Sequence, residues 1–308
     1  MRKILITGGA GNVAGSLASR LVQDKDNYVV IVDNLLTGCV SKLPSKKYSN
    51  WKFIKADVNN FKEVLPIMTS FAFDYVFHYA AVVGVKRTLL HPKMVLDDIE
   101  GIKNILDLAK NTGVKRVFFS SSSEVYGEPV EIPQHEERTP LNSRLPYAIV
   151  KNVGEAFFKS YHQEFGLDYG IFRFFNTYGP RQSTDFVITK FIGSALKGDD
   201  ITIYGDGSQT RTFCYIEDNL DVTEKILNEN LMVNDVLNIG SDIEMTILEL
   251  AQAVIQQTNS KSKIIHLPPL PEGDMTRRKP DNSKMLKILG KPLTSLEEGI
   301  RKTIELAF

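Results

Sequence analysis

The sequence predicts an α/β protein built on a doubly wound parallel sheet, with a smaller C-terminal lobe. Two observations lead to this fold class. In the first half of the chain, short apolar runs alternate with longer segments of helical periodicity, as expected when helices join parallel strands. The apolar runs also lack regular polar alternation, which indicates strands that are covered on both faces.

The strands are recognised as short runs of apolar and β-branched residues. The clearest runs are KILIT at 3–7 and YVVIVD at 28–33, whose only charged residues stand at one end. Such short runs are typical of buried strands rather than of helices. We expect strands over residues 3–7, 28–33, 51–56, 75–79, 114–120 and 168–174.

The helices are recognised by apolar residues that recur on one side. In GIKNILDLAK at 101–110, isoleucine and leucine gather on one face, the pattern of a helix that covers a sheet. Further helices are expected over 13–23 and 147–163.

The character of the chain changes after about Gly179. Short strands such as ITIY at 201–204 mix with turns rich in Gly, Asp and Pro. We therefore predict a first domain over 1–178 and a smaller lobe over 179–308. Segments near 213–240, namely 213–220 and 236–239, are expected to return to the first domain.

Composition excludes several classes of function. The 37 basic and 37 acidic residues cancel, so nothing global favours a nucleic acid or an anionic membrane as a partner. No stretch has the ~18 apolar residues of a membrane span. The two cysteines, Cys39 and Cys214, form neither a disulfide framework nor a metal-binding pattern, so we expect no metal and a reducing, cytoplasmic location.

A glycine-rich turn follows the first strand and opens the first helix. In the segment TGGAGNVA at 7–14, Gly8 and Gly11 permit a tight turn and the close approach of a pyrophosphate, and the helix N-terminus offers free amides to that anion. Ala14 stands where a third glycine is usual, at a position that only sets helix–strand packing. This context predicts a Rossmann-type dinucleotide-binding domain.

Asp33 indicates which dinucleotide is bound. It ends the second strand, about 20 residues after the glycines, where a carboxylate can accept both ribose hydroxyls. A carboxylate there repels a 2′-phosphate, and no arginine follows it, so we predict NAD rather than NADP. Asp57 and Val58, after the third strand, are candidates for the adenine, although Asp57 at a strand end is also explained as a cap.

A tyrosine and a lysine are spaced to share one helix face. Tyr147 and Lys151 are four residues apart at the start of the expected helix. An ammonium beside a phenol favours the phenolate, which can take a proton from a secondary alcohol. The spacing alone is common on solvated helices. The run SSSSEVYG at 120–127 adds hydroxyl groups at the carboxyl edge of the sheet, where ligands of such folds bind.

With these motifs the chain resembles the extended short-chain dehydrogenases/reductases, in the group of nucleotide-sugar epimerases, dehydratases and decarboxylases. The resemblance covers essentially the whole chain. Its motifs are TGGAGNVA at 7–14, VDNLLTG at 32–38, FHYAA at 77–81, SSSSEVYGEP at 120–129, YAIVK at 147–151, RFFNTYGPRQ at 173–182, IYGDGSQTRTFCYIED at 203–218, LNIGS at 237–241 and RRKPDNSK at 277–284.

The resemblance implies a role for each matching residue. Ser122, Tyr147 and Lys151 are the catalytic hydroxyl, the base and its partner, and bound NAD takes a hydride from sugar C4. NAD is expected to contact Gly8, Gly11, Asn12, Val13, Asp33, Asn34, Gly38, Asp57, Val58, Ala80, Ala81, Tyr147 and Lys151. The C-terminal lobe is expected to bind the nucleotide-sugar, and the substrate residues are Ser123, Arg144, Asn176, Arg181, Tyr204, Gln209, Arg211, Asn238 and Arg278. Asp98 and Ile102 depart from the family, where Asn-x-x-Gly-Thr is usual.

Glu124 decides which chemistry follows oxidation. A carboxylate two places after the catalytic hydroxyl is similar to UDP-glucuronate decarboxylases and to nucleotide-sugar 4,6-dehydratases, in which it serves as an acid/base near C5 and C6. Arg144 and the RRKPD segment at 277–281 are also similar to decarboxylases. The stretch between the serines and Tyr147 is not, so a 4-epimerase or a 4-dehydrogenase stays open as the main reading, with a decarboxylase or dehydratase as the alternative.

Two further expectations concern the whole protein. The helices at 101–110 and 147–163 are of the kind that pack across a two-fold axis in this family, which predicts a homodimer or a higher homo-oligomer. A non-catalytic NAD-binding regulator is the rival from another class. The intact Ser122, Tyr147 and Lys151 argue against it.

Overall fold

The computed structural model describes residues 1–268 and 277–308 and divides the chain into two compact units. Both units are assembled from segments that are distant in the sequence. The first comprises Met1–Val125, Ser143–Arg173 and Thr223–Leu237, and the second Tyr126–Asn142, Phe174–Val222 and Asn238–Phe308.

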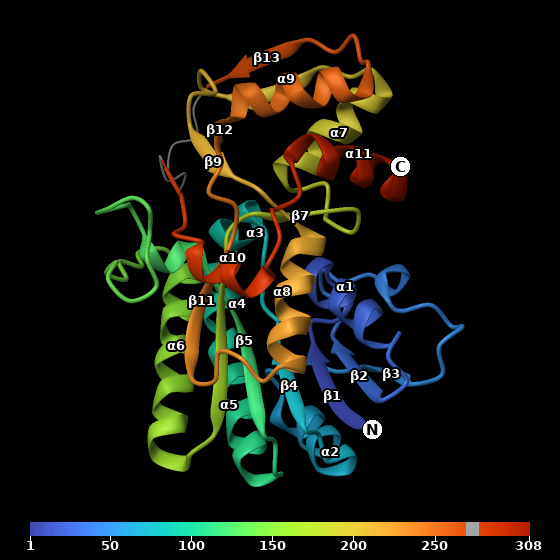
Figure 1. Cartoon of the computed structure of the whole chain (residues 1–308), viewed down its shortest axis with the longest axis vertical. Helices are drawn as coiled ribbons and strands as arrows, with labels where there is room; N and C mark the ends of the chain where they lie inside the picture. Colours follow the sequence, from blue (N-terminus) through green and yellow to red (C-terminus); the bar gives the residue numbers. More distant parts are fainter. Residues whose placement is uncertain (269–276) are drawn as a thin grey trace. The chain divides into compact units, whose positions relative to one another are not determined.

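A seven-stranded sheet forms the centre of the first unit (Figure 1). Its order is β11-β6-β5-β4-β1-β2-β3, and the pairs β1–β2, β1–β4, β2–β3 and β4–β5 are parallel. The chain runs outward from β1 to β3 and then back to β4 and outward the other way, so the predicted doubly wound sheet is confirmed. The strands are β1 (Arg2–Thr7), β2 (Asn27–Asp33), β3 (Trp51–Lys55), β4 (Tyr75–His78), β5 (Arg116–Ser122), β6 (Asp168–Phe174) and β11 (Asp235–Ile239).

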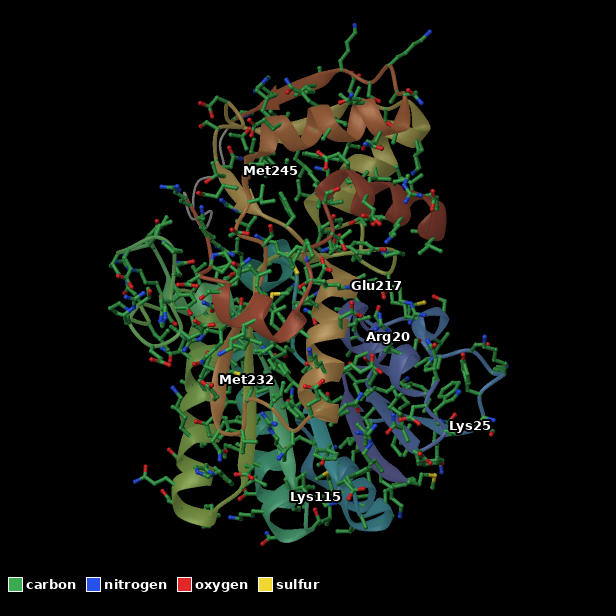
Figure 2. All side chains as sticks on the ribbon, in the orientation of Figure 1. Arg20, Lys25, Lys115, Glu217, Met232 and Met245 are labelled. Carbon is green, nitrogen blue, oxygen red and sulfur yellow. The ribbon has the colours of Figure 1, made fainter. Side chains whose placement is uncertain are left out.

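Helices cover both faces of this sheet. On one face, a continuous apolar core joins alternate strand residues to α2 (Phe61–Phe71), α4 (Pro92–Leu96), α5 (Asp98–Asn111) and α6 (Pro146–Phe165). On the other face lie α1 (Asn12–Leu21) and α8 (Ile216–Asn228), and Arg20 of α1, labelled in Figure 2, pairs with Glu224 of α8 at 3.2 Å. The short α3 (Val85–Leu90) precedes α4.

In the described part of the second unit the strands form three two-stranded sheets. β7 (Thr177–Tyr178) pairs with β10 (Cys214–Tyr215), β8 (Ile201–Tyr204) with β13 (Ile264–Leu267), and β9 (Thr210–Thr212) with β12 (Glu244–Thr246). Its helices are α7 (Val187–Lys197), α9 (Ile247–Thr258), α10 (Ser283–Leu289) and α11 (Leu296–Ala307). A reciprocal cap between Thr246 and Glu249 begins α9.

The observed domain division differs from the expected boundaries at residues 174–178 and 238–239, which lie in the second unit, and in two longer segments. Residues 126–142 lie in the second unit although they precede α6 of the first unit. The return to the first unit begins at Thr223, so residues 213–220 stay in the second unit. Among the described residues no helix is long and apolar enough to cross a membrane, and no cluster of side chains suits a metal ion.

Candidate active site

The glycine-rich turn lies between the end of β1 and the start of α1. Gly8 has φ +69°, and a Cβ there would stand 2.8 Å from the Ala80 Cα, so only glycine permits this close approach of the β4 end. Gly11 is the N-cap of α1 and has no side chain to cap the helix amides. The first turn of α1 therefore keeps its amides for an anion.

Thr7 ties the glycine turn to the segment that follows β4. Its hydroxyl oxygen accepts hydrogen bonds from the backbone amides of Tyr79 and Ala80, each at 3.1 Å. The same hydroxyl lies 3.0 Å from Nδ1 of His78. Burial lowers the pKa of His78 to about 3, so the ring is neutral and its Nδ1 can accept the Thr7 proton. These contacts place Ala80 and Ala81 beside the turn.

Asp33 organises the loop after β2. One carboxylate oxygen accepts the Ala10 amide at 3.0 Å, and the other accepts the Leu35 amide at 2.7 Å. A Cβ at Gly38 would stand 2.7 Å from the same carboxylate, which explains a glycine there. Each oxygen keeps a second lone pair for a ribose hydroxyl. Asn34 in this loop donates its side-chain amide to Asp57, which follows β3, at 3.2 Å.

The residues at this turn fit a dinucleotide. The capless α1 offers amides to a pyrophosphate, and Asp33 offers acceptors to a ribose. Asn12 adds a buried side-chain oxygen that has no hydrogen-bond partner among the described residues. A buried polar atom without a partner is costly, and a bound ligand would supply one. Val13 and Val58, also predicted to contact NAD, belong to the same unit.

Two of the predicted site serines lie where β5 ends, Ser122 on the strand and Ser123 in the turn after it. β5 extends through Ser122, further than expected, and a 3-10 turn over Ser123–Tyr126 follows. The Ser122 hydroxyl oxygen accepts the backbone amide of Glu124 at 3.2 Å, which fixes the serine relative to the partly exposed glutamate. Ser123 is 1% exposed. Its predicted substrate contact gains no support from this placement.

Tyr147 and Lys151 lie in the first two turns of α6, as the spacing predicts. Pro146 is the first helical residue, a position that suits its fixed φ and missing amide. The Lys151 ammonium donates to the Ser120 hydroxyl at 3.3 Å and lies 5.8 Å from the centre of the Tyr147 ring. Burial lowers the pKa of Lys151 to about 8, against a smaller opposing effect of Asp98.

A buried ion pair fixes α6 to the sheet one turn after Lys151. The Glu155 carboxylate accepts two hydrogen bonds from the Arg173 guanidinium, at 2.8 and 2.6 Å, and one from the Ser121 hydroxyl at 2.6 Å. Both charged side chains are at most 2% exposed. The pair joins α6, β6 and the strand that carries Ser122. Sequence reasoning missed it, although Glu155 follows Lys151 by one helical turn.

Two predicted phosphate-binding arginines lie in the second unit. Arg211 on β9 is 7% exposed and donates to the Thr210 carbonyl at 2.7 Å, and Arg278 is 8% exposed. Glu244 on β12, opposite Thr212 on β9, accepts a two-pronged bond from Arg277 at 2.6 and 2.7 Å. Glu244 thus links β9, the strand that carries Arg211, to Arg277, the residue before Arg278.

The two predicted asparagines serve the fold of the second unit. Asn176 donates to the Thr212 carbonyl at 3.0 Å. Asn238 is fully buried, where its amide nitrogen donates to the Gln134 carbonyl at 2.9 Å and its oxygen accepts the Tyr126 hydroxyl at 2.8 Å. These bonds account for the buried Asn238 side chain without a ligand, so the structure gives no support for a contact between Asn238 and a phosphate.

The remaining predicted substrate residues are more accessible. Arg144 is exposed, two residues before α6. Tyr204 is 40% exposed, and its carbonyl accepts a hydrogen bond from Gln209 at 3.3 Å. Burial lowers the pKa of Arg181, with Glu217 opposing that change.

Comparison with known proteins identifies the family. The model of the NAD dependent epimerase/dehydratase family matches residues 4–240. The chain belongs to this family. It is 37% identical to a UDP-N-acetyl-α-D-glucosaminuronate decarboxylase of Bacillus cytotoxicus, over 99% of this chain and 97% of that protein.

Solved structures of this epimerase/dehydratase family agree. UDP-glucose 4-epimerase of Thermotoga maritima superimposes with a TM-score of 0.91 at 30% identity, covering 99% of this chain and 98% of the other. UDP-glucuronic acid 4-epimerase of Bacillus cereus, solved with NAD, gives 0.89 at 28% identity over 99% and 98%. The protein is therefore an NAD-dependent enzyme of the extended short-chain dehydrogenase/reductase group.

Proposed function

We propose that this family member oxidises C4 of a UDP-linked hexuronate and then releases its carboxyl group as CO2. The observation that carries the proposal is Glu124, whose backbone amide donates to the Ser122 hydroxyl, so that a carboxylate two residues after the catalytic serine is held close to it. Two of the relatives named above support the substrate class, since one decarboxylates and the other epimerises a UDP-hexuronate.

The first step uses the residues of β5 and α6. Tyr147 removes the proton of the C4 hydroxyl, and Ser122 shares the hydrogen bond to that oxygen. The Lys151 ammonium favours the phenolate of Tyr147, because the two groups are neighbours on α6. The glycine-rich turn and Asp33 would hold NAD, and the bound cofactor would supply the redox chemistry, as acceptor of the C4 hydride and as its donor when the sugar is reduced again.

The second step follows from the chemistry of the substrate. A hexuronate with a C4 carbonyl is a β-keto acid. Its C5–C6 bond breaks with loss of CO2, and the electron pair passes to the C4 oxygen, where Tyr147 and Ser122 hold the developing charge. Glu124 then supplies the proton that C5 needs. Arg144 offers a guanidinium to the sugar carboxylate before it leaves.

The nucleotide is assigned to the second unit. Arg211 and Arg278 are the guanidinium groups for the diphosphate, because a planar fork of donors matches phosphate oxygens. Both side chains are at most 8% exposed, which restricts their movement. Beside Arg278, Arg277 forms a bidentate pair with Glu244.

A 4-epimerase is the second candidate. The epimerase structures that resemble this chain favour it. Epimerisation would use the same oxidation by Tyr147 and Ser122, but the hydride would return to the opposite face of C4. The two candidates differ in one measurable respect. Epimerisation conserves the mass of the substrate, whereas decarboxylation removes CO2.

Incubation with a panel of UDP-sugars tests the proposal. UDP-glucuronate and UDP-N-acetylglucosaminuronate are compared with UDP-glucose and with GDP- and dTDP-sugars, and products are identified by mass spectrometry and NMR. We expect a UDP-pentose or its N-acetyl counterpart from a uronate. An isomer of unchanged mass would support the epimerase instead, and loss of water would indicate a dehydratase.

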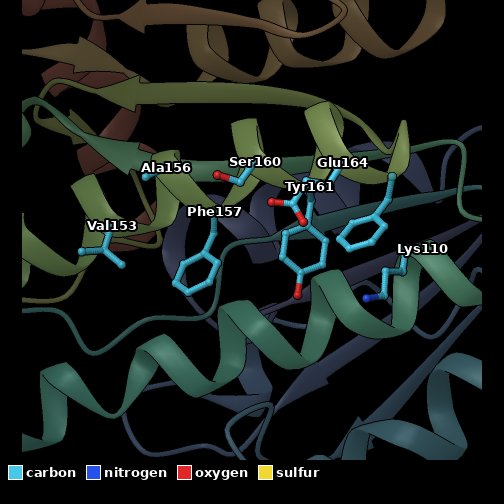
Figure 3. Close-up of a pocket in the computed structure, with 8 residues that line it drawn as sticks. Lys110, Val153, Ala156, Phe157, Ser160, Tyr161 and Glu164 are labelled. Atoms are coloured by element: carbon cyan, nitrogen blue, oxygen red, sulfur yellow. The ribbon is translucent and has the colours of Figure 1, made fainter.

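We also propose a homodimer in the cytoplasm. A groove on the outer side of α5 and α6 is lined by Lys110, Val153, Ala156, Phe157, Ser160, Tyr161, Glu164 and Phe165 (Figure 3). Lys110 lies 4.1 Å from the centre of the Phe165 ring, which is 51% exposed, and the Tyr161 hydroxyl donates to Asp107 at 2.8 Å. A second copy would cover this aromatic surface, since a two-fold axis sets the same helices against each other.

A further inference from the structure

The turn that follows β3, from Asp57 to Asn60, leaves one backbone amide unused. The Asp57 amide donates to the Glu63 carboxylate at 2.8 Å. The Asn59 amide donates to the Asp57 carboxylate at 2.9 Å, and the Asn60 amide to the Asp57 carbonyl at 3.0 Å. The Val58 amide, between them, has no hydrogen-bond partner among the described residues. The turn therefore keeps a single donor for a ligand.

The direction of the Val58 amide is set by its own peptide group. The Asp57 carbonyl and the Val58 amide belong to one planar trans peptide, so they point in opposite directions. Because the carbonyl accepts the Asn60 amide within the turn, the Val58 amide points away from that bond. The carboxylate of the neighbouring Asp57 accepts one protein donor at each oxygen and keeps a second lone pair on each. The turn thus offers a donor next to an acceptor.

Asn104, on α5, holds this turn through its backbone. Its half-buried side-chain amide donates to the Val58 carbonyl at 2.9 Å. The helix comes this close because residue 101 is a glycine: a Cβ on Gly101 would stand 2.4 Å from the Asn59 Oδ1 and 3.1 Å from the Val58 Cγ2. Glu63, which holds the Asp57 amide, is exposed. Asn104 is therefore the better shielded of these two side-chain contacts.

We propose that Asn104 is a positioning residue for the cofactor, which keeps the Val58 amide and the Asp57 carboxylate aligned with the adenine of NAD. The edge of adenine has an acceptor, N1, beside a donor, the N6 amino group, and so complements this pair of groups. The proposal rests on the NAD dependence of the family and on the adenine contact predicted for Asp57 and Val58. It does not depend on the reaction proposed above.

Nicotinamide hypoxanthine dinucleotide is the probe for this alignment. Its base has an oxygen in place of the N6 amino group and a proton on N1, so in the same pose donor meets donor and acceptor meets acceptor. We expect the wild type to bind NAD about tenfold better. In Asn104→Leu the Val58 carbonyl loses its partner and the turn can move, so this preference should fall about fivefold, the effect of about one hydrogen bond. A residue that only ties α5 to the turn would leave the preference unchanged.

A competition experiment measures the preference without any sugar substrate. The purified protein is equilibrated with equal concentrations of the two dinucleotides and freed of unbound nucleotide, and the bound nucleotides are quantified by mass spectrometry. Because only folded protein retains a dinucleotide, the ratio is that of the folded fraction even if a variant is less stable. Asn111→Leu is the matched control, since Asn111 also donates its side-chain amide to a backbone carbonyl, that of Asp107, at 2.9 Å.

The proposal predicts a lower ratio in Asn104→Leu and the wild-type ratio in Asn111→Leu. Should Asn104→Leu fail to fold, Asn104→Ala removes the same donor without adding bulk, and its ratio should fall in the same way. A wild type that does not distinguish the two dinucleotides would overturn the proposal. An unchanged ratio in the folded Asn104 variant, or an equal fall in Asn111→Leu, would overturn it as well.

Discussion

At the scale of single residues, the candidate site contains a buried cation, Lys151, whose charged form is destabilised by burial. Lys151 is 3% exposed, and burial brings its pKa to about 8 from 10.5. Such a lysine is charged at neutral pH but can lose its proton just above it. If Tyr147 is the base, as proposed, the Ser120 hydroxyl that accepts a hydrogen bond from this ammonium helps to hold the charge beside it.

Turnover should fall as the pH rises through about 8. The reason is that Lys151 then loses the charge that favours the Tyr147 phenolate. The effect on the free energy of unfolding has the opposite sign. Between pH 8 and 10.5 the unfolded chain holds a proton on Lys151 that the folded chain lacks. This group therefore makes the free energy of unfolding increase with pH in that window. A pH–rate profile beside unfolding curves checks both. An activity that rises through this range would contradict the assignment.

Asp33 should give NAD at least a tenfold advantage over NADP. Its carboxylate stands where a 2′-phosphate would lie, and like charges repel. Asp33→Asn keeps the shape of the side chain, and Asn34→Arg adds a cation, so the double variant should lose the preference. Dissociation constants of both cofactors for the apo protein measure this. Equal binding by the wild type would refute the assignment.

At the scale of elements, the buried pair of Glu155 and Arg173 holds the catalytic helix. Glu155→Leu should lower the free energy of unfolding by about 3–5 kcal/mol, because it leaves the guanidinium buried without a partner. Replacing both members by apolar residues should restore much of that loss. Denaturant unfolding measures the effect, with the exposed pair Lys302–Glu298 as a control that should change little. An equally small effect at both pairs would show that the buried pair does not hold α6.

The sheet was predictable because its strands have local signals. β6 and β8 have the expected bounds, and β1–β4 each differ by one residue. The helices of the second half, such as α7 and α9, were not assigned. The exchange of residues 126–142 into the second unit depends on long-range contacts, such as the Gln134 amide to the Lys279 carbonyl at 2.8 Å, which no local pattern reveals.

The site itself was predictable only in part. The shared position of Tyr147 and Lys151 at the start of α6 follows from their spacing, and the tight turn at Gly8 follows from its motif, because both depend on local geometry. The contributions of Thr7, His78 and Glu155 do not, since they arise where separate strands and helices meet. Asn238 is the opposite case: it matches the family motif, but its side chain already forms hydrogen bonds within the second unit.

At the scale of the whole molecule, the aromatic groove of α5 and α6 is expected to be a dimer interface. Phe157→Glu together with Phe165→Glu should convert a dimer into a monomer, because charges would face each other across the two-fold axis. Light scattering at micromolar concentration measures the mass. Leu306→Glu, at a 71% exposed position of α11, is the control and should leave the dimer intact. A wild-type protein that is monomeric would contradict the proposal.

The proposed reaction is tested most directly by following the carboxyl carbon of the substrate. UDP-glucuronate and its N-acetylated counterpart, each labelled at C6, are incubated with the NAD-loaded protein, and labelled CO2 is collected. We predict release from at least one substrate by the wild type. Tyr147→Phe should lower it about a hundredfold or more, because it lacks the general base, and Glu124→Gln should reduce the UDP-pentose formed. Conversion of the substrate into its 4-epimer with complete retention of the label would contradict decarboxylation and support the 4-epimerase.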